Sequence, residues 1–84
     1  MRPTLAEIDS AILEAEQVRA SHDGVHTIHS CVMVLLLCRT FAENGDWSDS
    51  NTEDFHGTVT KVRCINRTGF PPRAYPNGRI VVLV

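Results

Sequence analysis

An apolar run of eight residues, CVMVLLLC at 31–38, constrains the fold more than any other feature of this sequence. It lies in a stretch that has no Gly or Pro from Val25 to Asn44, too long for one strand. The pattern predicts a helix from residue 25 or 27 to 43, ended by Asn44-Gly45. A buried strand is the alternative for the run itself. Because eight apolar residues cover two turns, such a helix needs cover on every side.

An amphipathic helix is predicted before this segment. Thr4 and Glu7 have the spacing of a capping box, and Pro3 precedes them. Apolar residues then follow at helical spacing: Leu5, Ile8, Ala11, Ile12, Ala15 and Val18. We expect this helix to extend from about 4 to 21 and to end near Asp23-Gly24.

The second half of the chain favours strands. Residues 44–57 are polar and acidic and are typical of a loop, whereas TVTKVRCI at 58–65 is rich in β-branched residues. Three prolines and two glycines make 66–78 a loop, and 79–84 is an apolar terminal strand. The expected fold is therefore α+β, a single domain over 1–84. In it, two N-terminal helices pack on a small antiparallel sheet of two C-terminal strands.

Size and cysteine content bear on assembly and compartment. A chain of 84 residues buries little of its surface, so we expect a homodimer that either shares the second helix or continues the sheet between chains. The apolar run is shorter than the roughly 20 residues of a membrane helix, and acidic residues near the start do not fit a signal peptide. Three cysteines indicate buried free thiols in a reducing compartment. The sequence thus predicts a cytoplasmic protein without membrane association.

Charge is divided unevenly along the chain. Residues 1–57 hold all ten acids and three bases, which gives −7, and residues 58–84 hold five bases and no acid, which gives +5. Such a division is typical of a chain with a charged partner for one end. It is equally compatible with attraction between the two halves inside the fold.

Reactive residues are present but do not form a known catalytic or metal-binding pattern. His22, His26 and His29 precede Cys31 at spacings that could suit zinc, but no CxxC or HExxH motif accompanies them. We therefore interpret them as residues at a helix start. Cys64 lies eight residues after His56, which is about 26 Å on an extended strand, too far for a catalytic pair. We expect no enzyme activity, no cofactor and no metal.

Two segments are candidates for partner contact. The C-terminal loop combines arginines and aromatics on a backbone stiffened by proline, a combination enriched at interfaces: Arg67, Phe70, Arg73, Tyr75 and Arg79. Alternatively, its aromatic residues cap the core. The acidic loop offers a second patch, Asp46, Trp47 and Asp49, or else is a solvated connector whose tryptophan packs on the core.

These features favour a non-catalytic, small protein-binding regulator. We expect an adaptor or inhibitor of a larger protein complex. A small acidic domain of this composition is typical of phage and mobile-element accessory proteins, including inhibitors of host defence. The alternative is a nucleic-acid-binding regulator that uses the basic C-terminal third. That alternative predicts binding with a strong dependence on salt concentration.

Overall fold

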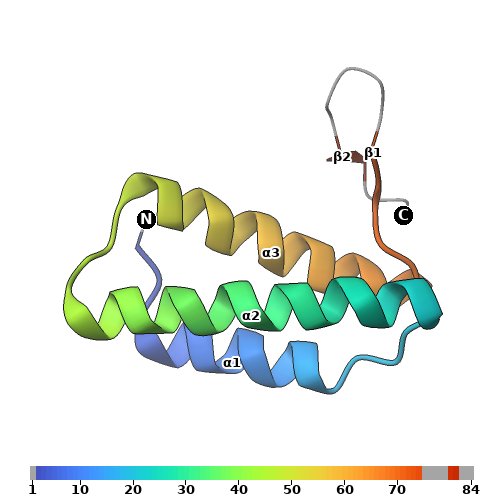
Figure 1. Cartoon of the computed structure of the whole chain (residues 1–84), viewed down its shortest axis with the longest axis horizontal. Helices are drawn as coiled ribbons and strands as arrows, with labels where there is room; N and C mark the ends of the chain where they lie inside the picture. Colours follow the sequence, from blue (N-terminus) through green and yellow to red (C-terminus); the bar gives the residue numbers. More distant parts are fainter. Residues whose placement is uncertain (1, 75–79, 82–84) are drawn as a thin grey trace.

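Three helices form the body of the protein. The computed structural model describes residues 2–74 and 80–81. Its helices are α1 (Leu5–Glu16), α2 (His22–Asn44) and α3 (Asp49–Thr68). In Figure 1, α2 lies between the other two and is antiparallel to both. Two short strands follow, β1 (Arg73–Ala74) and β2 (Ile80–Val81), which pair antiparallel.

The expectation of an α+β fold is wrong, because the predicted strand at 58–65 lies inside α3. The buried residues of α3 include Phe55, Thr58, Val62 and Ile65, whose spacing of three, four and three residues is helical. The same segment also alternates loosely, so β-branched residues favoured the strand interpretation. Packing of this apolar stripe against α1 and α2 outweighs the low helix propensity of those residues.

The predicted acidic loop is also mostly helix. The Ser48 side chain caps α3 by accepting a hydrogen bond from the backbone N–H of Asn51, and Gly69 ends the helix in the left-handed conformation. Of the expected terminal strand at 79–84, the structure describes Ile80–Val81, which form β2 and pair with β1; the other four residues lie outside the described part. No described helix packs on this two-residue ladder. The fold is a small all-helical domain.

The N-terminal helices match the sequence more closely. The capping box of Thr4 and Glu7 is confirmed, but α1 ends at Glu16, several residues before the expected end. Asp23-Gly24 does not end α1. It lies in the first turn of α2, whose N-cap Ser21 accepts from the Gly24 N–H. The second helix and its end at Gly45, with φ of 75°, are confirmed.

A close contact at Gly24 joins the start of α2 to the end of α3. The backbone N–H of Ser21 donates to the carbonyl of Gly69 at 2.9 Å. A Cβ at Gly24 would lie 2.6 Å from that carbonyl oxygen and 2.9 Å from the Cβ of Ala20. Glycine is therefore required for this approach of the two helices.

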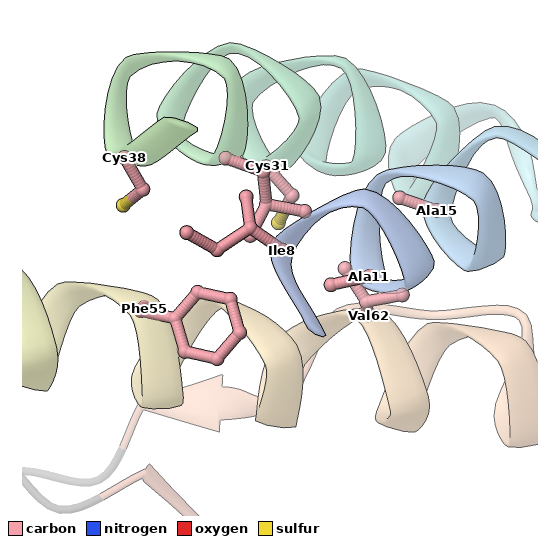
Figure 2. Close-up of a cluster of buried hydrophobic side chains, with 8 residues drawn as sticks. Ile8, Ala11, Ala15, Cys31, Cys38, Phe55 and Val62 are labelled. Carbon is pink, nitrogen blue, oxygen red and sulfur yellow. The ribbon is translucent and has the colours of Figure 1, made fainter. Parts of the chain in front are cut away.

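The core lies between the three helices (Figure 2). α1 contributes Ile8 and two alanines, α2 contributes Leu35 and two cysteines, and α3 contributes Phe55 and Val62. The three cysteines, Cys31, Cys38 and Cys64, are free and buried, which confirms the prediction of buried thiols. Small side chains on α1 and α2 let these two helices lie close together.

Only α2 among the described helices is long and apolar enough to cross a membrane by length and composition. Its most apolar stretch of 18 residues has a mean hydropathy of 1.5. Length and composition alone are weak evidence for a membrane span, and one side of α2 contributes Cys31, Leu35 and Cys38 to the core. The helix is therefore not a clear membrane span.

Candidate protein-binding surface on helix α2

The side of α2 that faces away from α1 and α3 is exposed and largely apolar along its middle. We call it the outer face. Its members share one side of the helix and are all exposed: His26, His29, Met33, Leu36, Leu37, Thr40 and Glu43. Met33 is 56% exposed, Leu36 42% and Leu37 54%. Single exposed apolar residues are common on proteins, but a contiguous group indicates a contact surface.

The sequence predicted a helix covered on every side, and the described part of the chain does not provide that cover. Only 17% of the most apolar stretch of α2 is buried. α1 and α3 together cover the side that carries Leu35, and no third described helix lies over the opposite side. Sequence analysis missed Met33, Leu36 and Leu37 as site residues. The signal was present, because the run at 31–38 holds more apolar residues than two neighbouring helices can bury.

A leucine on α1 widens the exposed surface. Arg39 on α2 forms an ion pair with Asp9 on α1, with 2.9 Å between the arginine Nε and the carboxylate oxygen. Leu13 lies four residues after Asp9, and Leu36 lies three before Arg39. Since the helices are antiparallel, both leucines lie about one turn from the ion pair in the same direction, toward the C-terminal end of α1 and the N-terminal end of α2. Both are exposed.

A groove between α2 and α3 borders the outer face on its other side. Its volume is about 500 Å³. α2 lines it with Val34 and Leu37, and α3 supplies polar and small residues: Glu53, Asp54, Gly57, Thr58, Thr60 and Lys61. A Cβ at Gly57 would meet no atom within 4 Å, so the groove is open there. Leu37 belongs to both surfaces and makes them continuous.

The predicted acidic patch is divided between the core and the solvent. Trp47 lies in the connection between α2 and α3, is half-buried and packs against the core. Its indole N–H donates to the Thr52 hydroxyl at 2.6 Å. Asp46 is exposed beside it, and Asp49 is the exposed first residue of α3. The tryptophan therefore fixes the connection to the core.

The predicted C-terminal contact residues begin at the end of α3. Phe70 is 57% exposed, while its backbone is held by the Thr68 side chain, which accepts from the Phe70 N–H at 3.1 Å. Arg67 is exposed in the last turn of the helix. Arg73 lies in β1, and Tyr75 and Arg79 lie outside the described residues. Whether these five residues form one surface stays a prediction.

An ion pair between α3 and α1 brings charges of the two halves of the chain together. Lys61, Arg63 and Arg67 lie on α3. The Nε of Arg63 lies 3.9 Å from a carboxylate oxygen of Glu14 on α1. The arginine side chain is 70% exposed, so this ion pair contributes little to stability. The ion pair is one example of attraction between the acidic residues of 1–57 and the basic residues of 58–84.

The cysteines and histidines of the described residues do not form a metal-binding group, although the rings of His22 and His26 contact each other edge-on at 5.5 Å between centroids. No group of three or more His, Cys, Asp or Glu side chains in residues 2–74 and 80–81 could hold a metal ion. Cys64 and His56 lie on one helix, so eight residues separate them by about 12 Å rather than the 26 Å of a strand. The Cys64 thiol instead contacts the Phe70 carbonyl, at 3.7 Å.

Burial also makes two of the thiols poor nucleophiles. It raises the pKa of Cys31, and the nearby positive charge of Lys61 offsets part of that rise. It raises the pKa of Cys38 as well, and there the negative charge of Asp54 adds to the effect. Both thiols are therefore neutral at physiological pH and suited to packing.

Comparison of the chain with protein-family models, with curated proteins and with solved structures gives no match.

Proposed function

We propose that this protein is a non-catalytic, protein-binding regulator of the cytoplasm, and that the outer face of α2 is its main contact surface. The observation that carries the proposal is the exposure of Met33, Leu36 and Leu37 side by side on a helix whose opposite side forms the core. Exposing them costs apolar hydration free energy, which a protein partner would recover by burying them.

The neighbouring surfaces support a protein as the ligand. The groove between α2 and α3 continues the apolar outer face and is bordered by Glu53, Asp54 and Lys61. An apolar centre with a polar rim is the usual composition of a protein interface. Groove and outer face together can accept an amphipathic helix, which contributes apolar residues at helical spacing.

A photo-crosslinking residue at position 33 tests this function. We would replace Met33 with benzoylphenylalanine, irradiate the protein in native extract, and identify the covalent products by mass spectrometry. The proposal predicts crosslinks to protein, because the Met33 side chain lies at the centre of the contact surface. The same products should survive treatment with nuclease.

A matched control separates specific contact from random collision. Benzoylphenylalanine at Gln17, which is exposed at the end of α1, should give far less of the same products. Equal crosslinking from both positions would contradict the proposal. Loss of the products after nuclease would favour the nucleic-acid interpretation instead.

The C-terminal residues Arg67 and Phe70 are proposed as a second contact. Both side chains are exposed at the end of α3, and the backbone of Phe70 is already held in place by Thr68. A rigid, exposed aromatic residue loses little conformational entropy on binding. Replacing Phe70 with Ala is expected to weaken binding of a partner that contacts the end of α3 severalfold. Crosslinking from position 33 to a partner that contacts only α2 should not change.

A further inference from the structure

The outer face of α2 has an apolar centre between two polar ends, and the exposed Val25 lies beyond its N-terminal end. Met33, Leu36 and Leu37 form its apolar centre. Polar residues border them on both sides, with His26 and His29 toward the N-terminal end and Thr40 and Glu43 toward the C-terminal end. A two-fold dimer pairs each residue of a surface with a different residue of the same surface, so the surface must be complementary to itself. An apolar centre with imidazoles at one end and a carboxylate at the other meets this condition.

We infer that the outer face binds the same face of a second copy of this chain, with the two α2 helices antiparallel about a two-fold axis. This inference rests on the proposed function and names the partner of that surface. An axis between Met33 and Leu36 places Met33 of each copy against Leu36 of the other. The same axis places His29 opposite Thr40 and His26 opposite Glu43.

Charge favours the antiparallel arrangement over a parallel one. Antiparallel packing brings the imidazole of His26 to the carboxylate of Glu43 in the second copy, at both ends of the interface. It also places the positive end of each helix dipole beside the negative end of the other. A parallel pair would place Glu43 against Glu43 and align the dipoles. The Glu43 side chain is 48% exposed, with one oxygen 3.4 Å from the Nε of Arg39.

The surface suits a second copy better than a lipid surface. Helices that bind anionic membranes carry several Lys or Arg residues beside the apolar face. α2 carries a single one, Arg39, and this residue already lies against Asp9 and Glu43. Asp23 and Glu43 near its two ends would oppose binding to anionic lipid.

The size of the contact indicates a moderate affinity. The distance from His26 to Glu43 is about 26 Å along the helix axis. Leu13 of α1 extends the strip sideways at the level of Leu36. Contacts between single helices fall at the lower end of specific interfaces in area. We therefore expect a dimer that dissociates on dilution, with a dissociation constant on the order of micromolar.

Sedimentation equilibrium of the full chain tests the dimer. The wild type should change from monomer at low concentration to dimer at high concentration. Met33→Glu places a carboxylate in the apolar centre of each copy and should weaken the dimer at least about 100-fold. Gln17→Glu, which adds the same charge at an exposed position at the end of α1 and outside both the outer face and the groove, should leave the dissociation constant within about twofold. A dilute far-ultraviolet circular dichroism spectrum shows whether each variant is folded.

Cysteine crosslinking tests the orientation. A His29→Cys variant mixed with a Thr40→Cys variant should form a disulfide between the two, because these positions face each other across the axis. Neither variant alone should crosslink as rapidly. Rapid crosslinking of His29→Cys with itself would overturn the antiparallel arrangement.

The outcomes separate this inference from the proposed function. A wild-type chain that is monomeric at all concentrations, but crosslinks from position 33 to another protein, overturns the dimer and leaves the binding function in place. A monomer that gives no protein crosslink from position 33 overturns both. Binding to anionic lipid vesicles that Met33→Glu abolishes would also overturn both.

Discussion

The two sides of α2 have similar composition and different surroundings. The inner side contributes Cys31, Leu35 and Cys38 to the core, and Leu35 is fully buried. The outer side places Met33, Leu36 and Leu37 in contact with solvent. Both sets belong to one run of eight apolar residues. Hydrophobicity along the sequence therefore does not distinguish the residues that fold this domain from those that we propose bind its partner.

The difference arises from the number of helices. A central helix in a bundle is covered by its neighbours only where they touch it, and α1 and α3 cover one side of α2. We propose that another polypeptide buries the remaining apolar residues. The inner side then serves folding and the outer side association.

Truncating one leucine on each side should give the largest difference. Leu35→Ala leaves a cavity in the core and should lower the free energy of unfolding by about 2–5 kcal/mol. Leu36→Ala removes an exposed side chain and should change it by less than about 0.5 kcal/mol. Urea unfolding of dilute protein measures both values without a contribution from the dimer. Equal losses would break the distinction between the two sides.

Two glycines inside helices, Gly24 in α2 and Gly57 in α3, should give smaller effects that are opposite in sign to each other. Gly24→Ala places a Cβ against the Gly69 carbonyl and should destabilise the fold by about 1–3 kcal/mol. Gly57→Ala faces the open groove and should stabilise it by up to about 1 kcal/mol, because alanine has the higher helix propensity. Thermal unfolding would show opposite shifts in Tm. A destabilising Gly57→Ala would indicate that the groove is filled.

The thiols of the inner side should give a pH dependence. Because burial raises the pKa of Cys31 and Cys38 above the ordinary value of 9.0, the folded state holds these protons more tightly than the unfolded state. Their contribution to stability is complete below about pH 9 and is lost as the pH rises through the folded-state pKa. We expect the urea midpoint to fall above pH 9.

Labelling extends the same comparison to reactivity. At pH 8 a thiol reagent should modify an outer-side Leu36→Cys thiol quickly, because that position is exposed. Cys31 and Cys38 should react only as fast as the protein opens. Rapid labelling of the native cysteines in the folded protein would contradict their placement in the core.

The sequence predicted the first half of the fold well and the second half poorly. A capping box marks a helix start, and the stretch from Val25 to Asn44 without Gly or Pro is too long for one strand, so α1 and α2 were found although the run at 31–38 alone also fits a buried strand. The segment 58–65 fits both a strand and a helix, and packing of Val62 and Ile65 against the other helices decides between them. Local propensity does not contain that information.

The candidate site could be predicted only in part. The excess of apolar residues in α2 was visible in the sequence and indicated a homodimer, but the helices that cover it determine which residues remain exposed. Trp47 illustrates a case with two interpretations. Its acidic segment suggested either a contact residue or a tryptophan that packs on the core, and the fold confirms the packing and joins its indole N–H to Thr52.

One measurement tests the division of α2 most directly. The chain has two methionines, so a protein labelled with ¹³C at the methionine methyl groups gives an isolated signal for Met33. We would record its broadening by a soluble nitroxide over a dilution series. The account predicts strong broadening in dilute protein and protection at high concentration, when the second copy covers the methyl group. A methyl signal that stays protected at every dilution would show that the chain itself covers the outer face, and a signal exposed at every concentration would contradict the dimer.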